Sequence, residues 1–261
     1  MIQKDSNTNT GCQDINYYFD DFTEENYRNI LRLAKSNYQS ISFSDYNISG
    51  KCILLRHDVD YSVHRALKLA EIESEEDIRS TFFLWMHSPF YNLFEEEISE
   101  IVRKIIGLGH EIGLHFDTGF YECHTLKNVD IMNHLSYEKS IIEHFIGKPV
   151  TSFSLHNPSD SMIKKFRLNS YRGMVNTYSK YIRMNFEYCS DSSGYWRFRR
   201  LQDMLEKAEF EKIQILTHPE WWTPDILHPR ERISRCIEGR RKKQHEWYDS
   251  MLKGLGRENV H

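Results

Sequence analysis

Cysteine is scarce in this sequence. The five cysteines stand at positions 12, 52, 123, 189 and 236, an odd number with no Cys-x-x-Cys pair among them. This spacing excludes a disulfide framework and a cysteine-rich zinc site, and it is typical of reduced thiols in a cytosolic protein.

Long apolar runs and an excess of positive charge are also missing. No stretch is long and apolar enough to cross a bilayer, and the first residues, MIQKDSNTNTGCQD, lack the apolar core of a signal peptide. The formal net charge is -4 and the pI is about 6.4, so nothing points to nucleic acid or an anionic membrane. We therefore expect a cytoplasmic protein without a transmembrane segment or a nucleic-acid partner.

Several familiar catalytic motifs are absent as well. GxSxG, a Walker loop, GxGxxG and HExxH do not occur, which removes support for acyl-serine, nucleotide-phosphate and zincin chemistry. The composition is that of an ordinary globular protein, with 39% hydrophobic and 28% charged residues in a chain of 261. That length suits one large α/β domain or two small ones. We expect residues 1–15 to be disordered or loosely attached and residues 16–261 to form a single domain with a helical C-terminal tail.

Apolar strands alternate with amphipathic helices along the chain. Strand patterns cover residues 52–58, 80–85, 111–115, 150–155 and 212–217, with weaker candidates at 174–175 and 188–191. Helical spacing covers residues 23–36, 63–74, 94–106, 128–145, 162–168, 201–207 and 230–254. This order predicts an α/β fold in which parallel strands are joined by right-handed crossovers.

Four of the predicted strands end in ionisable side chains. Parallel strands place all their carboxyl ends on one side, and in a closed barrel these ends converge on the face that holds the active site. Alternation along an extended chain puts two of the carboxylates on the same side of their strand. The residues at these strand ends are Asp58, Asp60, His115, Asp117, His156 and His218.

These residue types indicate metal-assisted hydrolysis. Aspartate oxygens and histidine nitrogens are good zinc ligands, and three protein ligands leave a position for water. A divalent cation lowers the pKa of such a water toward neutrality. A nearby carboxylate can then take its proton, while a histidine across the site protonates the leaving group.

An ordered set of motifs resembles the polysaccharide deacetylase superfamily, the family 4 carbohydrate esterases. The set comprises RHDVDYS (56–62), STFFLWMHSPFY (80–91), GHEIGLHFD (109–117), SLHNPS (154–159), DSSGYW (191–196) and ILTHPEWW (215–222). The resemblance covers roughly residues 20 to 225. It implies an irregular (β/α) barrel with about seven parallel strands.

The resemblance also implies roles for single residues. Asp58 resembles the family's catalytic base, and His218 resembles the acid that protonates the leaving amine. Asp191 resembles the carboxylate that tunes this histidine. Trp196 resembles a wall of the substrate pocket, and His57 lies next to the base, where we expect it near the substrate.

The expected metal ligands depart from the family pattern at one position. Asp60 and His115 resemble metal ligands of the family, but the usual second histidine is replaced by Gly119. His156 stands where many members have an arginine that orients the base, and we prefer it as the third ligand. Asp117 is the rival third ligand and otherwise a substrate contact.

The resemblance implies a metal-dependent hydrolase that removes an acetyl group from an N-acetylated amino sugar. The setting it suggests is the synthesis or modification of a surface polysaccharide, with a nucleotide-linked or lipid-linked sugar as substrate. Zinc is the expected metal, with cobalt, nickel or iron as alternatives. Two other readings stay open: hydrolysis of another amide or a formyl group, and a catalytically silent relative that binds glycans. The missing histidine supports the silent hypothesis, whereas the presence of both Asp58 and His218 argues against it.

Overall fold

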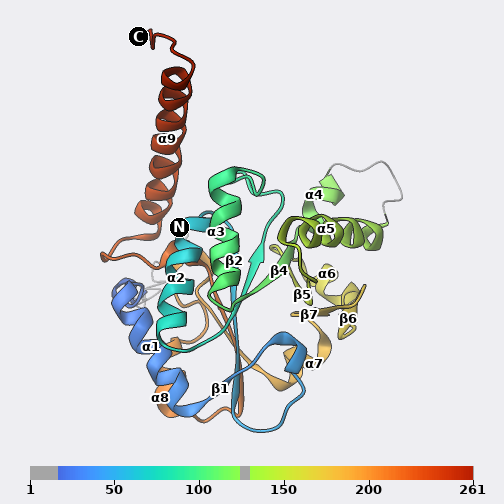
Figure 1. The fold of residues 1–261 in the computed structure, drawn as a ribbon. Coiled ribbons are helices and arrows are strands. Elements are labelled where there is room, and N and C mark those ends of the chain that lie inside the picture. The colour runs from blue at the N-terminus through green and yellow to red at the C-terminus, as the bar shows by residue number, and fades with distance from the viewer. Residues whose placement is uncertain (1–16, 124–129, 261) are drawn as a thin grey trace, which may run out of the picture.

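The protein is built on one curled sheet of mostly parallel strands (Figure 1). The computed structural model describes residues 17–123 and 130–260, so the disorder predicted for residues 1–15 lies outside the described residues. The strands follow the spatial order β6–β7–β5–β4–β3–β2–β9–β8, and β1 pairs with β2. They are β1 (Gln39–Ser40), β2 (Cys52–Val59), β3 (Thr81–Leu84), β4 (Glu111–Phe116), β5 (Ser152–Leu155), β6 (Ser170–Tyr171), β7 (Met174–Asn176), β8 (Glu187–Ser190) and β9 (Lys212–Thr217).

The sheet is a half-barrel rather than a closed one. Within the described part of the chain, β8 pairs only with β9, and the far edge ends in the antiparallel pair of β6 and β7. All the other strand pairs are parallel. The predicted α/β fold with parallel strands is confirmed, and each of the seven predicted strands is present. The structure adds the two-residue strands β1 and β6.

Helices cover the sheet and continue the predicted alternation. The longer ones are α1 (Glu24–Asn37), α2 (Val63–Glu75), α3 (Glu96–Gly107), α5 (Ile131–Ile146), α8 (Leu201–Lys207) and α9 (Pro229–Gly254). Short helices are α4 (Thr118–Cys123), α6 (Asp160–Lys165) and α7 (Lys180–Asn185), and 3₁₀ turns are η1 (Phe19–Asp21), η2 (Phe43–Asp45), η3 (Ser192–Gly194) and η4 (Pro219–Trp221). None of the described helices combines the length and apolar character needed to cross a bilayer.

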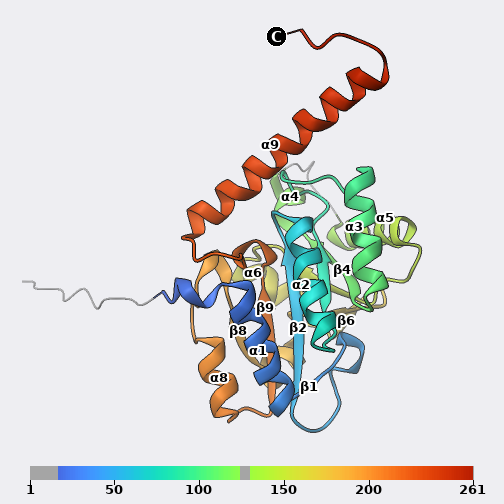
Figure 2. The same cartoon turned by 60° about the vertical axis from the view of Figure 1, so that its left-hand side comes forward.

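The central strand β2 is buried along its whole length. It pairs with β3 on one side and with β9 on the other, so neither edge is open to solvent. Side chains alternate between the two faces of the sheet. Arg56 and Asp58 therefore point to the inner, concave face, while His57 and Val59 point outward. Figure 2 shows α1, α2 and α3 as a layer over this outer face.

The inner face of the sheet is apolar at its lower end and polar above. Leu54 and the ring of Phe83 belong to a small core with Phe43 from η2 and Phe186 after α7. Gly113 in β4 leaves the space that this ring fills, because a Cβ at Gly113 would lie 2.4 Å from Phe83. The packed lower end closes the half-barrel beneath the polar side chains.

A buried carboxylate, Glu73, joins the outer helices to the sheet. It accepts hydrogen bonds from Tyr27 of α1, from Ser80 Oγ at 2.5 Å and from His57 Nε2 at 2.6 Å. Burial raises the pKa of Glu73, but the Coulomb attraction and hydrogen bond of His57 outweigh it and hold this pKa below its ordinary value. One carboxylate thus satisfies polar groups from three elements.

Removing this carboxylate should destabilise the fold strongly. We expect Glu73→Ala to lower the free energy of unfolding by about 3–5 kcal/mol, because it leaves buried hydrogen-bond donors without an acceptor. Urea denaturation measures the loss. The matched control is Glu75→Ala on the same helix, whose side chain is 59% exposed and whose removal should change stability by about 0.5 kcal/mol or less. Equal stability of the two variants would contradict this role of Glu73.

Candidate metal centre

Three potential metal ligands meet at the upper end of the half-barrel. Asp60 follows β2, His115 lies in β4 and His156 follows β5, and one ligand atom from each lies within 4.8 Å of the other two. Asp60 Oδ1 is 3.3 Å from His115 Nε2 and 3.6 Å from His156 Nδ1, and the two ring nitrogens are 3.0 Å apart. Ligands held about 2.0–2.2 Å from a tetrahedral zinc ion lie about 3.3–3.6 Å from one another. The spacing therefore fits a small divalent cation.

One ligand atom of this cluster, Asp60 Oδ1, has no hydrogen-bond partner among the described residues. The Oδ1 atom of Asp60 is buried, and it accepts no well-aligned hydrogen bond from the described residues. Its approaches to the two imidazoles are ion-pair contacts rather than aligned hydrogen bonds. Burial raises the pKa of Asp60, but His115 and His156 outweigh it and lower this pKa below the ordinary value. A carboxylate oxygen held ionised beside two imidazole nitrogens is a suitable donor set for a cation.

Neighbouring side chains orient the two histidine rings. His115 Nδ1 lies 2.6 Å from Ser154 Oγ, which leaves Nε2 to face Asp60. The ring of His156 stacks on Trp85 at 3.9 Å, and Asn157 Nδ2 lies 3.1 Å from its Nε2. Such contacts fix which nitrogen of a histidine is available to a metal.

Asp58 lies beside the ligands on the same inner face. Ser154 Oγ donates to its Oδ1 at 3.1 Å, and the fully buried Arg56 places Nη2 3.3 Å from its Oδ2. Arg56 also donates to Thr177 Oγ1 and, at 3.1 Å, to Tyr178 Oη. Burial lowers the pKa of Arg56, but the charge of Asp58 outweighs it and raises this pKa above the ordinary value. The carboxylate therefore has a fixed position and a permanent positive charge next to it.

His218 faces the cluster from the end of β9. Its Nε2 lies 4.0 Å from Asp60 Oδ2, and its Nδ1 lies 2.7 Å from Asp191 Oδ1. Asp191 is fully buried and also accepts hydrogen bonds from the His218 amide and from Trp222 Nε1. Burial lowers the pKa of His218, but its hydrogen bond to Asp191 and the charges of Asp191 and Asp60 raise it to about 10. The ring is thus a cation at neutral pH with a proton directed at the cluster.

The structure brings six of the predicted site residues together and leaves three out. The six are Asp58, Asp60, His115, His156, Asp191 and His218. Among the rivals for the third ligand position, His156 belongs to the cluster, whereas Asp117 does not. Asp117 instead accepts the amide of Phe120 at the start of α4.

The substrate contact predicted for His57 is wrong. Its ring is fully buried on the outer face, with Nε2 at 2.6 Å from Glu73 and Nδ1 at 2.6 Å from Thr217 Oγ1. Trp196 donates a hydrogen bond to Asp21 and packs on Trp222, the residue that binds Asp191. Its role in the wall of a substrate pocket stays a prediction.

The sequence analysis missed the supporting residues Arg56, Ser154 and Trp222. The first two stand two residues before a predicted site residue on the same strand, so the two-residue alternation of a strand was the signal for both. Trp222 has no comparable signal, because its contact with Asp191 depends on how two loops meet.

Comparisons with known proteins find solved structures of similar fold. No family model matches the sequence, and no curated protein matches it. A family 4 pseudoenzyme from Bacillus anthracis is 16% identical, with a TM-score of 0.39 over 74% of this chain and 62% of that one. This chain therefore spans less than two thirds of the pseudoenzyme's length.

Two further solved structures are similar over more of their own length. A family 4 acetyl xylan esterase from Clostridium thermocellum, in complex with a cobalt ion, is 14% identical, with a TM-score of 0.41 over 72% of this chain and 84% of that one. A chitin deacetylase from Colletotrichum lindemuthianum is 12% identical, with a TM-score of 0.41 over 77% and 86%. Both proteins belong to the group that the sequence motifs resemble, and this chain shares their fold.

The charge of His218 gives a test of the site in the metal-free protein. The pKa of His218 in the folded protein is about 10, which is above its unfolded value of about 6.5. The ion pair of His218 with Asp191 therefore contributes its full stabilisation of the fold below about pH 6.5. That contribution is lost as the pH rises through about 10. We expect Asp191→Asn to bring the NMR titration of this ring down toward 6.5 and to cost about 3 kcal/mol at pH 6. A wild-type ring that titrates near 6.5 would contradict the assignment.

Proposed function

We propose that this protein is a metal-dependent hydrolase that removes the acetyl group from an N-acetylated amino sugar. The observation that carries this proposal is the meeting of three ligand atoms, a carboxylate outside the ligand set and a charged imidazole at one end of the half-barrel. Asp60, His115 and His156 would hold the divalent cation. When bound, such a cation polarises a carbonyl oxygen and lowers the pKa of water.

Asp58 is the residue that we propose as the general base. Water attacks the acetamide carbonyl carbon, and Asp58 takes the proton that the water loses. The contacts of Asp58 with Arg56 and Ser154 suit this role, because they hold its carboxylate 3.7 Å from the ring of His115 without placing it among the ligands. The base thus acts beside the metal ligands rather than as one of them.

His218 is the residue that we propose as the general acid. When the C–N bond breaks, the departing nitrogen takes the proton of His218 Nε2, so that acetate and a free amine leave the site. Asp191 fixes the ring through Nδ1 and stabilises its positive charge. With a dication held at Asp60, the positive charge of His218 would be opposed and its pKa would move back toward neutrality, closer to the value that suits an acid at neutral pH.

The setting that we propose is the synthesis or modification of a surface polysaccharide in the cytoplasm, with zinc as the metal and a nucleotide-linked or lipid-linked sugar as substrate. Cys52, Cys189 and Cys236 are free thiols, which suits a reducing compartment. The alternative of a catalytically silent glycan-binding protein rested on the histidine that is missing at Gly119. Because His156 supplies a ligand atom at a suitable distance, the missing histidine is no longer an argument against a metal site.

The proposed base and ligands can be separated by substitution. We expect Asp58→Asn to lower kcat by about 10²–10⁴-fold with unchanged zinc content, because Asp58 is not a ligand. His156→Ala should lose zinc as well as activity. The measurements are acetate release from N-acetylglucosamine, its oligomers and its nucleotide conjugate, together with elemental analysis of the purified variants.

Each outcome of this experiment has a distinct meaning. Wild-type turnover by Asp58→Asn would show that the base is wrong. Full zinc content in His156→Ala would show that the ligand set is wrong. Release of formate, or of another acid from a non-sugar amide, with no acetate from any sugar would favour the alternative hydrolase.

A further inference from the structure

Helix α9 is the longest of the described helices, with 26 residues, and it continues beyond the body of the protein. Figure 2 shows its first half crossing over the start of α2 and its second half extending past all the other elements. Residues 241–250 are all exposed. Within the described part of the chain, no hydrogen bond or ion pair joins residues 244–260 to the rest of the protein.

The first half of the helix is firmly attached to the body. Arg240 forms two hydrogen bonds with Glu95, and Lys243 Nζ lies 3.0 Å from Glu97 at the start of α3. Near the beginning of the helix, the fully buried Arg232 donates to two backbone carbonyl groups. The direction in which the second half projects is therefore fixed.

The second half carries large apolar side chains that nothing covers. Trp247 is 68% exposed, Tyr248 47% and Leu255 57%. Exposed apolar side chains gathered in one place mark an interaction surface. A helical segment of about 12 residues is also marginal in water without tertiary packing, so a partner that packs on this segment would stabilise it.

Six residues of α9 and its C-cap lie on one face of the helix, which we call the α9 stripe. They are Ile237, Arg241, Gln244, Tyr248, Met251 and Leu255. Their spacing alternates between four and three residues, which is the spacing of the contact positions in a two-helix coiled coil. The α9 stripe therefore has the pattern of a helix that pairs with another helix.

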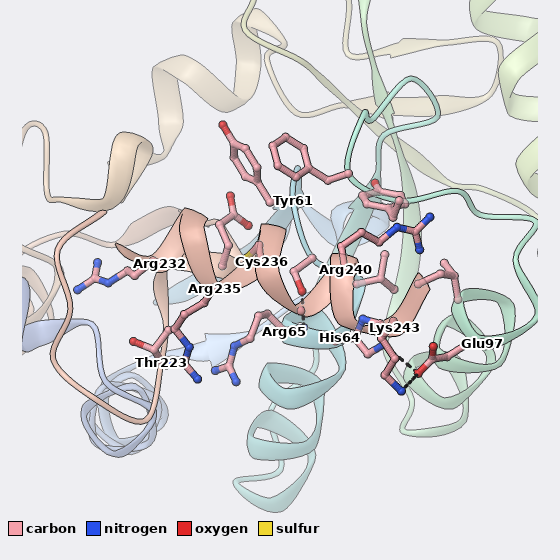
Figure 3. A pocket seen from close by; sticks show the side chains of 17 residues that line it. Tyr61, His64, Arg65, Glu97, Thr223, Arg232, Arg235, Cys236, Arg240 and Lys243 are labelled. Atoms are coloured by element: carbon pink, nitrogen blue, oxygen red, sulfur yellow. Dashed lines mark hydrogen bonds and ion pairs between the residues drawn. The ribbon is translucent and has the colours of Figure 1, made fainter. Parts of the chain in front are cut away.

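The α9 stripe faces away from the body of the protein. Cys236, Gly239 and Lys243 line the cavity between α9 and the body (Figure 3), and the stripe is turned from these residues by about a third of a helical turn. The chain after α9 folds back, with the Arg257 amide 2.9 Å from the carbonyl oxygen of Leu252. Leu252 is thereby buried, whereas the stripe stays open.

Charge and side-chain size make the α9 stripe complementary to itself in the antiparallel direction. A parallel pair would place Arg241 against its own copy and the basic run 240–243 against the same run. An antiparallel pair that aligns the two ends of the stripe avoids both repulsions, and it brings the basic run beside the turn of Glu246 and Asp249. The facing pairs are then Ile237 with Leu255, Arg241 with Met251, and Gln244 with Tyr248.

The same charges disfavour an anionic membrane as the partner. Arg241 is paired with Glu238 at 2.8 Å, and Lys242 lies 3.7 Å from Glu246. Acidic and basic side chains thus alternate over the exposed segment, whereas a helix that lies on anionic lipid has a polar face rich in Lys and Arg.

We propose that α9 pairs with α9 of a second copy of this protein, antiparallel and through the α9 stripe. The residues 237–255 of each helix would run side by side over about 28 Å, with the two bodies at opposite ends of the pair. This inference does not depend on the proposed function.

The first experiment is sedimentation velocity of the full-length protein. We expect a dimer, twice the 31.3 kDa of the chain, at concentrations of about 10–100 µM. Tyr248→Glu should weaken the dimer by about tenfold or more, because it places a charge in the contact. The matched control is Ser250→Glu, which adds the same charge about 200° around the helix and should leave the dimer unchanged.

A charge pair tests the direction of the two helices. Ile237→Glu alone and Leu255→Lys alone should each weaken the dimer. The double variant should recover it, because each glutamate then faces a lysine of the other copy; in a parallel pair, like charges would meet and the dimer would stay weak. All these positions are exposed, so the circular dichroism of every variant should match that of the wild type.

Three results would overturn the proposal. They are a wild-type protein that stays monomeric over the whole concentration range, a dimer that Tyr248→Glu leaves intact, and a double variant that does not recover the dimer. A monomer that binds vesicles of anionic lipid through Tyr248 would assign the α9 stripe to a membrane instead.

Discussion

A row of charged side chains on the inner face of β2 is the constraint on which the rest of the structure depends. Arg56 and Asp58 in β2 and Asp60 just after it alternate with other residues, so one stretch of chain places a buried cation, a buried carboxylate and a partly buried carboxylate side by side. Burying an ion costs several kcal/mol unless partners compensate it. Arg56 compensates Asp58, and Asp60 instead faces His115 and His156. The carboxylate without a fixed cation of its own is the one best placed to share a metal ion.

The two faces of β2 have different roles: the outer face joins the sheet to the helices, and the inner face carries the residues of the site. On the outer face His57 binds Glu73 and helps to join the sheet to the helices, with no access to solvent. On the inner face the charged row meets His218, whose proton is held ready by Asp191. A shift of one residue in the register of β2 would exchange these roles, which is why the packed core beneath the site, around Leu54 and Phe83, matters for the chemistry.

Much of this arrangement could be predicted from the sequence. The strands and their polar ends follow from apolar runs and the direction of a parallel sheet, and these placed Asp60, His115 and His218 on one rim. The preference for His156 over Asp117 rested on the resemblance and not on the strand pattern, because the position of each side chain depends on how β4 and β5 are offset. The role of Trp222 could not be predicted for a similar reason, since the packing of two loops decides that Trp222 holds Asp191. The short helices α4 and α7 carry too few residues for a period to be visible.

The most direct test of the central claim is the position of a bound metal. In a crystal soaked with zinc, anomalous scattering at the zinc edge should give one strong peak between β2, β4 and β5. It should lie about 2.0–2.2 Å from Asp60 Oδ1, His115 Nε2 and His156 Nδ1, with Asp58 outside the coordination sphere. A peak coordinated by Asp117 in place of His156, or the absence of any peak at this rim, would contradict the account.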